Sequence, residues 1–142
     1  MTLRVTRAVI ESLLEQARAA HPEECCGILL GHGGAITAMR PARNVHPMPA
    51  THFEIDPQAL IDAHRAARDG AGDGDGAGAG NWQEVAGYYH SHPRGPASPS
   101  ATDRASASGD GRIWAIVAKS DIRFWRDGEQ GFAALSYSET DG

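Results

Sequence analysis

Two histidines and a later aspartate are the residues of this sequence best placed to do chemistry. His90 and His92 end an apolar stretch, and Asp103 follows a loop rich in proline and glycine. Residues two apart on a strand point to the same face, so both imidazoles can meet one metal ion. Imidazole and carboxylate ligands suit Zn²⁺, and three protein ligands leave a fourth position for a catalytic water. The pattern predicts one zinc ion held by His90, His92 and Asp103.

Each of these residues also has a simpler explanation. Ser100 and Asp103 have the spacing of a capping box, in which each side chain binds the backbone N–H of the other at the start of a helix. The two histidines could be a surface pair at the end of a strand. One motif can hold both roles of the aspartate, because a helix that starts at Ser100 aims Asp103 in a fixed direction.

Hydrolysis by a zinc-activated water also needs a general base. Glu24 is the candidate, because it opens the apolar segment 25–30, where a charge has no structural purpose. Glu23 is the alternative, but on a strand Glu24 shares a face with Cys26 and Ile28. Without the histidine motif, both acids would be read as solvated residues at a strand start. Cys26 is interpreted as a small buried residue and not as a nucleophile.

Periodicity predicts the elements that position these residues. The segment 69–80 is rich in Gly and Asp and is expected to be a flexible surface loop. The whole chain, 1–142, is expected to be a single mixed α/β (α+β) domain with a curved, largely antiparallel or mixed β-sheet flanked by helices. Helices are expected from a cap at Thr6 to about Ala20, from Asp56 to about Arg68 and over 100–107, and strands over 3–5, 25–30, 35–39, 84–91, 113–118, 122–126 and 132–137.

Composition excludes several classes of protein. The 142 residues carry a formal net charge of −5, and Lys and Arg are scattered, which argues against a general nucleic-acid binder. An apolar content of 41% suffices for one core, but the apolar runs are too short to span a bilayer. The adjacent Cys25 and Cys26 form no disulfide framework, and the N-terminus shows no signal peptide. We therefore expect a reduced, cytoplasmic protein with no membrane partner.

Taken together, two motifs resemble the JAMM zinc metalloproteases of the JAB1/MPN/Mov34 family, in particular its small bacterial members. The first is His90-x-His92-Pro93 followed by Ser100-x-x-Asp103, and the second is Pro22-x-Glu24-x-Cys26-Gly27. The resemblance implies the MPN, cytidine-deaminase-like architecture and hydrolysis of a peptide or isopeptide bond after the C-terminal Gly-Gly of a ubiquitin-like protein. It also implies that Glu24 is the general base and that Ser100 hydrogen-bonds the oxyanion.

The details of the sequence favour one kind of substrate within that family. Eukaryotic deubiquitinating members carry an ordered insertion where this chain has 69–80, so processing of a sulfur-carrier protein, or of its conjugate, fits better than a dedicated deubiquitinase. Two alternatives remain: a RadC-like, nucleic-acid-associated JAMM protein and a non-catalytic MPN binding scaffold. The acidic balance and the Glu24 segment count against the first, and the complete ligand set counts against the second. The sequence does not indicate an oligomeric state.

Overall fold

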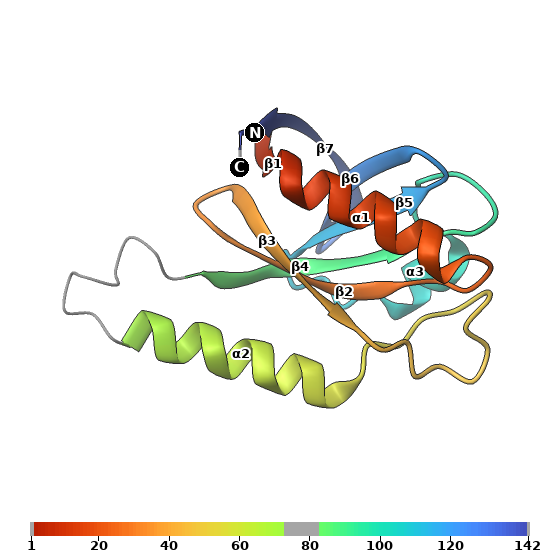
Figure 1. Ribbon diagram of the computed structural model, residues 1–142, viewed down its shortest axis with the longest axis horizontal. Coiled ribbons are helices and arrows are strands. Elements are labelled where there is room, and N and C mark those ends of the chain that lie inside the picture. Colours follow the sequence, from red (N-terminus) through yellow and green to blue (C-terminus); the bar gives the residue numbers. More distant parts are fainter. Residues whose placement is uncertain (1, 73–82, 142) are drawn as a thin grey trace.

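The computed structural model describes residues 2–72 and 83–141. Figure 1 shows the helix α3 and the C-terminal end of α1 at the same end of the molecule, with α2 along its lower side. The elements in chain order are β1 (Thr2–Thr6), α1 (Arg7–Ala20), β2 (Cys26–His32), β3 (Ala35–Ala42), α2 (Pro57–Gly72), β4 (Glu84–Ser91), α3 (Ala101–Ser106), β5 (Ile113–Ala118), β6 (Asp121–Gly128) and β7 (Gly131–Thr140).

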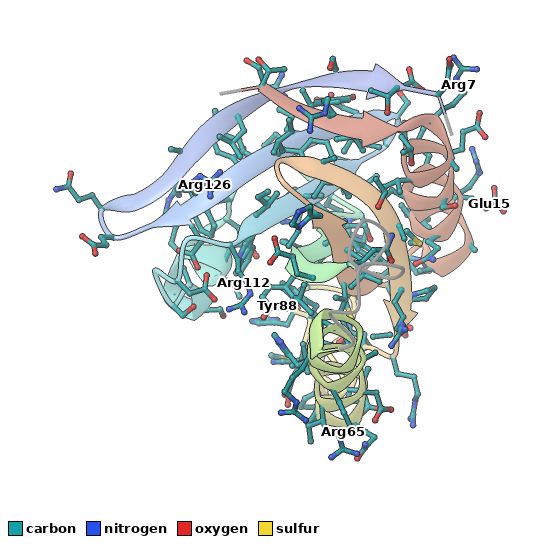
Figure 2. All side chains as sticks on the ribbon, turned by 90° about the vertical axis from the view of Figure 1, so that its left-hand side faces the viewer. Arg7, Glu15, Arg65, Tyr88, Arg112 and Arg126 are labelled. Carbon is teal, nitrogen blue, oxygen red and sulfur yellow. The ribbon has the colours of Figure 1, made fainter. Side chains whose placement is uncertain are left out.

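The strands form one mixed sheet that curves until it closes. Its order is β1-β3-β2-β4-β5-β6-β7, and β1 pairs in parallel with both β3 and β7. β4 and β5 are also parallel, and all other neighbours are antiparallel. Figure 2 shows the strands curving around, with α1 and α2 on different sides of the sheet. The predicted mixed α/β class and curved sheet are confirmed, and closure by β1 is the feature that the sequence did not indicate.

Strand alternation divides the buried side chains between two faces of the sheet. On β2, Leu29 packs in the main core with the α1 residues Val9 and Leu13, whereas Ile28 and Leu30 pack on the other face, toward α2. α1 begins at its predicted cap, where the Thr6 hydroxyl accepts the N–H of Val9 at 3.3 Å. None of the described helices is long and apolar enough to cross a membrane.

Several element boundaries differ from the prediction. β3 extends to Ala42, three residues beyond Met39, because its outer half stays paired with β2 as far as Cys26. α2 continues through Gly72 and so includes the first four residues of the predicted loop. The helix continues beyond the periodic apolar residues from which its end was predicted. The rest of that predicted loop, 73–80, lies outside the described residues.

One glycine sits where two strands approach closely. The pairing of β2 with β4 shifts register between Leu29 and Leu30, which face Gly87 and Val85. This irregularity has the form of a β-bulge, which bends a strand locally. A Cβ on Gly87 would overlap the backbone carbonyl of Ile113 on β5. Glycine therefore allows β4 to pack against β5 and to carry the histidines at its end.

We expect Gly87→Ala to lower the free energy of unfolding by about 1–3 kcal/mol, because the added methyl must push two paired backbones apart. Urea denaturation monitored by circular dichroism measures this loss. Glu84→Ala, an exposed position on the same strand, is the control and should stay within about 0.5 kcal/mol of the wild type. Equal stability of the two variants would contradict the close approach.

Candidate metal centre and catalytic cleft

Three potential ligand atoms converge at the end of β4. Nε2 of His90 and Nε2 of His92 are 3.2 Å apart, and each lies 3.0 Å from an oxygen of Asp103. In the part of the chain that the structure describes, these three side chains have ligand atoms close enough together to hold one metal ion, and all three are buried. A tetrahedral zinc ion with bonds of about 2.0–2.1 Å separates its ligand atoms by roughly 3.3 Å. The structure thus brings the predicted triad together at nearly the spacing that zinc requires.

The hydrogen bonds of His92 show that the triad needs a positive charge at its centre. Nδ1 of His92 lies 2.8 Å from the carbonyl oxygen of Pro96, which can only accept, so Nδ1 carries a proton. In a neutral ring Nε2 is then a bare acceptor that faces an acceptor oxygen of Asp103. Either a second proton or a metal cation must lie between them. A neutral ring held by its other nitrogen is the usual state of a zinc-bound histidine.

Burial and pairing shift the pKa values of the triad in different directions. Burial lowers the pKa of His90 below its ordinary value, although Asp103 opposes this shift. Burial also acts to lower the pKa of His92, but hydrogen bonds to Asp103 and the Pro96 carbonyl outweigh it and raise the value. Burial acts to raise the pKa of Asp103, but hydrogen bonds to both histidines hold it far below its ordinary range. The carboxylate is therefore ionised and available as a ligand.

A helix start fixes the position of Asp103. The hydroxyl of Ser100 accepts the N–H of Asp103, and the N–H of Ser100 donates to Oδ2 of Asp103, both at 3.0 Å. This is the predicted capping box at the N-terminus of α3. Oδ2 also lies 3.0 Å from His92, so the capping and ligand roles coexist. The hydroxyl of Ser100 is used as an acceptor in the cap, which leaves its proton free to donate into the cleft.

Glu24 lies in a cleft beside the triad. The cleft has a volume of about 330 Å³, and Glu24, Thr51, His92 and Ser100 are among its lining residues. The side chain of Glu24 is buried, and burial raises its pKa to about 7, with His92 lowering and Asp103 raising it. A carboxyl group with this pKa can take up or release a proton near neutral pH. Glu23, the alternative, is exposed.

Backbone hydrogen bonds clamp Glu24 from both sides. Its carbonyl accepts the side-chain amide of Asn44 at 3.0 Å, and its N–H donates to the carbonyl of Pro49 at 2.7 Å. The next residue, Cys25, donates its N–H to the hydroxyl of Ser91 at 2.9 Å. Ser91 lies between the two histidines, so the acid and the metal ligands are tied to one frame. This role of Ser91 could not be predicted from the sequence, because a serine that faces away from the two histidines shows no pattern of its own.

An aromatic wall around His90 was not foreseen from the sequence. The ring of Phe53 stacks on His90 with 4.2 Å between centroids, and Trp114 meets it edge-on at 5.6 Å. Trp114 is on β5, opposite Tyr88 in the parallel pairing with β4. Paired residues of neighbouring strands point to the same face, so Trp114 shares the face of Tyr88 and His90. This follows only once the pairing of the strands is known. These rings keep His90 buried and fix the plane of its imidazole.

Two further residues, Cys26, which pairs with His90 across β2 and β4, and His52, make contacts of a structural kind. Cys26 is buried, with its sulfur 3.9 Å and 3.7 Å from the carbonyls of Ala42 and Arg43, as expected for a small structural residue. Burial raises its pKa to about 12, which disfavours a thiolate. His52 stacks on His46 in the loop before α2, with 4.6 Å between centroids.

Comparisons with known proteins agree with this geometry. Residues 6–128 match the family model Prok-JAB, described as prokaryotic homologs of the JAB domain. The chain is also similar in fold to a JAB1/MPN domain protein from Archaeoglobus fulgidus, with a TM-score of 0.57, 19% identity and coverage of 97% of this chain and 98% of that one. The latter match supports the fold alone.

Two curated relatives carry functional names. A desampylase from Haloferax volcanii is 34% identical over 113 residues, which cover 78% of this chain and 73% of the relative. A "probable TtuB-protein conjugate cleaving protease" from Thermus thermophilus is 33% identical over 104 residues, which cover 72% of this chain and 62% of the relative. These matches, with the family model, identify an enzyme of the hydrolase class. The chain belongs to the Prok-JAB family, the prokaryotic homologs of the JAB domain, as its two motifs implied.

Proposed function

We propose that this protein is a zinc metallopeptidase that hydrolyses the peptide or isopeptide bond after the C-terminal Gly-Gly of a ubiquitin-like protein, of the sulfur-carrier kind, or of its conjugate. The observation that carries the proposal is the buried triad of His90, His92 and Asp103 beside the acid Glu24 in one cleft. The desampylase and the TtuB-conjugate protease support the choice of substrate, since their names describe cleavage of such conjugates.

Each residue of the site has its own role in the proposed reaction. His90, His92 and Asp103 would hold a zinc ion, which would supply a Lewis acid for activating water and polarising the scissile carbonyl. Glu24 accepts the proton of the attacking water and later gives it to the departing amine, which its pKa of about 7 suits. The hydroxyl of Ser100 donates to the carbonyl oxygen as that oxygen gains negative charge. His92 stays oriented throughout by its bond to the Pro96 carbonyl.

Mass spectrometry provides the direct test of this function. Ubiquitin-like sulfur carriers from the same genome, each extended or conjugated after Gly-Gly, are incubated with the zinc-loaded protein. We expect a mass loss that corresponds to cleavage after the second glycine. If zinc is bound and none of the carriers is cleaved, the proposed substrate class is wrong.

The zinc site has a test that does not depend on activity. We expect Asp103→Asn to weaken zinc binding by more than about 100-fold, since even the outer partners of metal ligands are worth 10–100-fold. The asparagine can still accept at the helix start, so α3 should keep its cap. Competition with a zinc-binding dye measures the affinity. Asp110→Asn, at an exposed carboxylate outside the triad, is the matched control and should bind zinc as the wild type does.

We expect Glu24→Gln to retain zinc and to lose turnover, because glutamine fills the same space but cannot accept the proton of water. Metal content and the rate of conjugate cleavage are measured on the same preparation. His92→Ala should lose both. Cleavage by Glu24→Gln at the wild-type rate would show that another group is the base.

We expect Ser100→Ala to reduce kcat by about 10²-fold, the typical cost of removing one oxyanion donor. The same change also removes a helix cap, which costs about 0.5–2 kcal/mol of stability. Ser100→Thr keeps both the cap and the hydroxyl and should restore most of the rate. Ser100→Gly removes the hydroxyl donor but costs the helix start only about a few tenths of a kcal/mol, so wild-type kcat in that variant would indicate that the serine acts only through the helix.

A further inference from the structure

A second groove lies along α1, next to the catalytic cleft. It has a volume of about 450 Å³ and runs between the last turns of α1 and the β5–β6 turn; we call it the α1 groove. His92 and Pro93 line both this groove and the catalytic cleft. Figure 1 shows the C-terminal end of α1 at the same end of the molecule as α3, which carries Asp103. The α1 groove is therefore a neighbouring surface for the part of a substrate that extends from the triad past His92 and Pro93.

The α1 groove combines an apolar floor with basic side chains. Leu14, Ala17 and Val117 contribute the floor, and Arg18 and Lys119 contribute the charges. No carboxylate lines it among the described residues. Arg18 pairs with Glu15 at 2.9 Å, but both side chains are 70% exposed, so water screens this pair. On a chain with a net charge of −5, such a groove favours acidic partners.

The backbone of Lys119 gives an independent reason to assign a role to its side chain. Lys119 has a φ of 57° and is the non-glycine residue with positive φ in the described part of the chain. Glycine or asparagine adopts this conformation more readily at such a turn. A strained backbone position that keeps a long, charged side chain is a reason to look for a function of that side chain.

The position of Glu24 indicates which part of the substrate enters the α1 groove. Under the proposed function, Glu24 gives its proton to the departing amine, so the leaving group lies on the Glu24 side of the triad. The cleft that contains Glu24 lies next to the α1 groove, since His92 and Pro93 line both. The opposite side, at His90, is covered by Phe53 and Trp114, which line a separate apolar groove.

We propose that the α1 groove binds the leaving-group side of the conjugate and selects acidic side chains next to the modified lysine. This inference rests on the proposed function and adds a specificity to it. Arg18 and Lys119 attract the acidic side chains, while the floor accommodates the aliphatic stem of the lysine. The enzyme would then remove the ubiquitin-like protein preferentially from acidic segments of its targets.

The test compares two conjugates that differ only in charge. One ubiquitin-like carrier is joined through its Gly-Gly to a lysine in a short peptide, flanked by Asp and Glu in one conjugate and by Asn and Gln in the other. We expect kcat/KM to be about threefold to tenfold higher for the acidic conjugate, as for one or two exposed ion pairs. The preference should shrink as salt is raised from 0.05 to 0.5 M. Equal kcat/KM values at low salt would overturn the inference.

Three variants test whether the α1 groove is the source of the preference for the acidic conjugate. Lys119→Gly removes the charge and relieves the backbone, so we expect it to fold at least as stably as the wild type while its preference falls toward 1. Lys119→Glu should reverse the preference. Arg65→Glu makes the same kind of charge change on α2, which Figure 2 shows far from α1, and should keep the wild-type ratio. An acidic preference unchanged in Lys119→Glu would show that the α1 groove is not its source.

A binding measurement distinguishes failure of this inference from failure of the proposed function. Fluorescence anisotropy measures the affinity of each labelled conjugate for zinc-loaded Glu24→Gln, with and without Lys119→Glu. If neither conjugate is cleaved by the wild type, the proposed function fails. A preference for the acidic conjugate that Lys119→Glu abolishes still supports the α1 groove as its binding site, and equal affinities overturn it.

Discussion

The carboxylate of Asp103, shared between two buried imidazoles, is the interaction on which the site depends. Its two oxygens each lie 3.0 Å from a histidine nitrogen, and the side chain is almost fully removed from water. A buried carboxylate that faces unprotonated nitrogens is tolerable only if protons or a metal ion supply positive charge. One of these oxygens, Oδ2, also accepts the N–H of Ser100 and so holds the first turn of α3. Losing this one group would therefore disturb the metal site and the helix together.

The surrounding fold sets the ligand positions through backbone geometry. Strand alternation turns His90 and His92 to one face of β4, and the N–H of His92 bonds the carbonyl of Val117 on the neighbouring strand. Glycine at 87 lets these strands approach, and Ser91 ties the same segment to the residue after Glu24. His90 is thus attached to a paired strand and Asp103 to a capped helix, while Glu24, just before β2, is held by backbone hydrogen bonds. Such support keeps a site in one geometry.

The sequence predicted that His90, His92 and Asp103 meet, and it predicted a buried acid beside them and most elements, because each of these leaves a local pattern. The His-x-His spacing indicates two side chains on the same face of a strand, and the Ser100–Asp103 spacing indicates a helix cap. An acid at the start of an apolar run indicates a buried charge. Closure by β1 and the approach of Trp114 to His90 depend on which strands pair, and pairing between distant segments leaves no local pattern. The hydrogen bonds that hold Glu24 could not be predicted for the same reason, since Asn44 and Pro49 are remote from it in sequence.

These supports also distinguish this centre from a structural zinc site. In structural sites the metal contributes much of the folding free energy, and four protein ligands surround it. Here hydrogen bonds to Pro96 and Ser100 already orient His92 and Asp103, and only three protein ligands converge. A metal ion held by these three residues would have a fourth position open, and the adjoining cleft contains an acid whose pKa lies near neutrality. The fold bears the cost of burying the acid, and the cleft gains a carboxyl group that can exchange a proton near neutral pH.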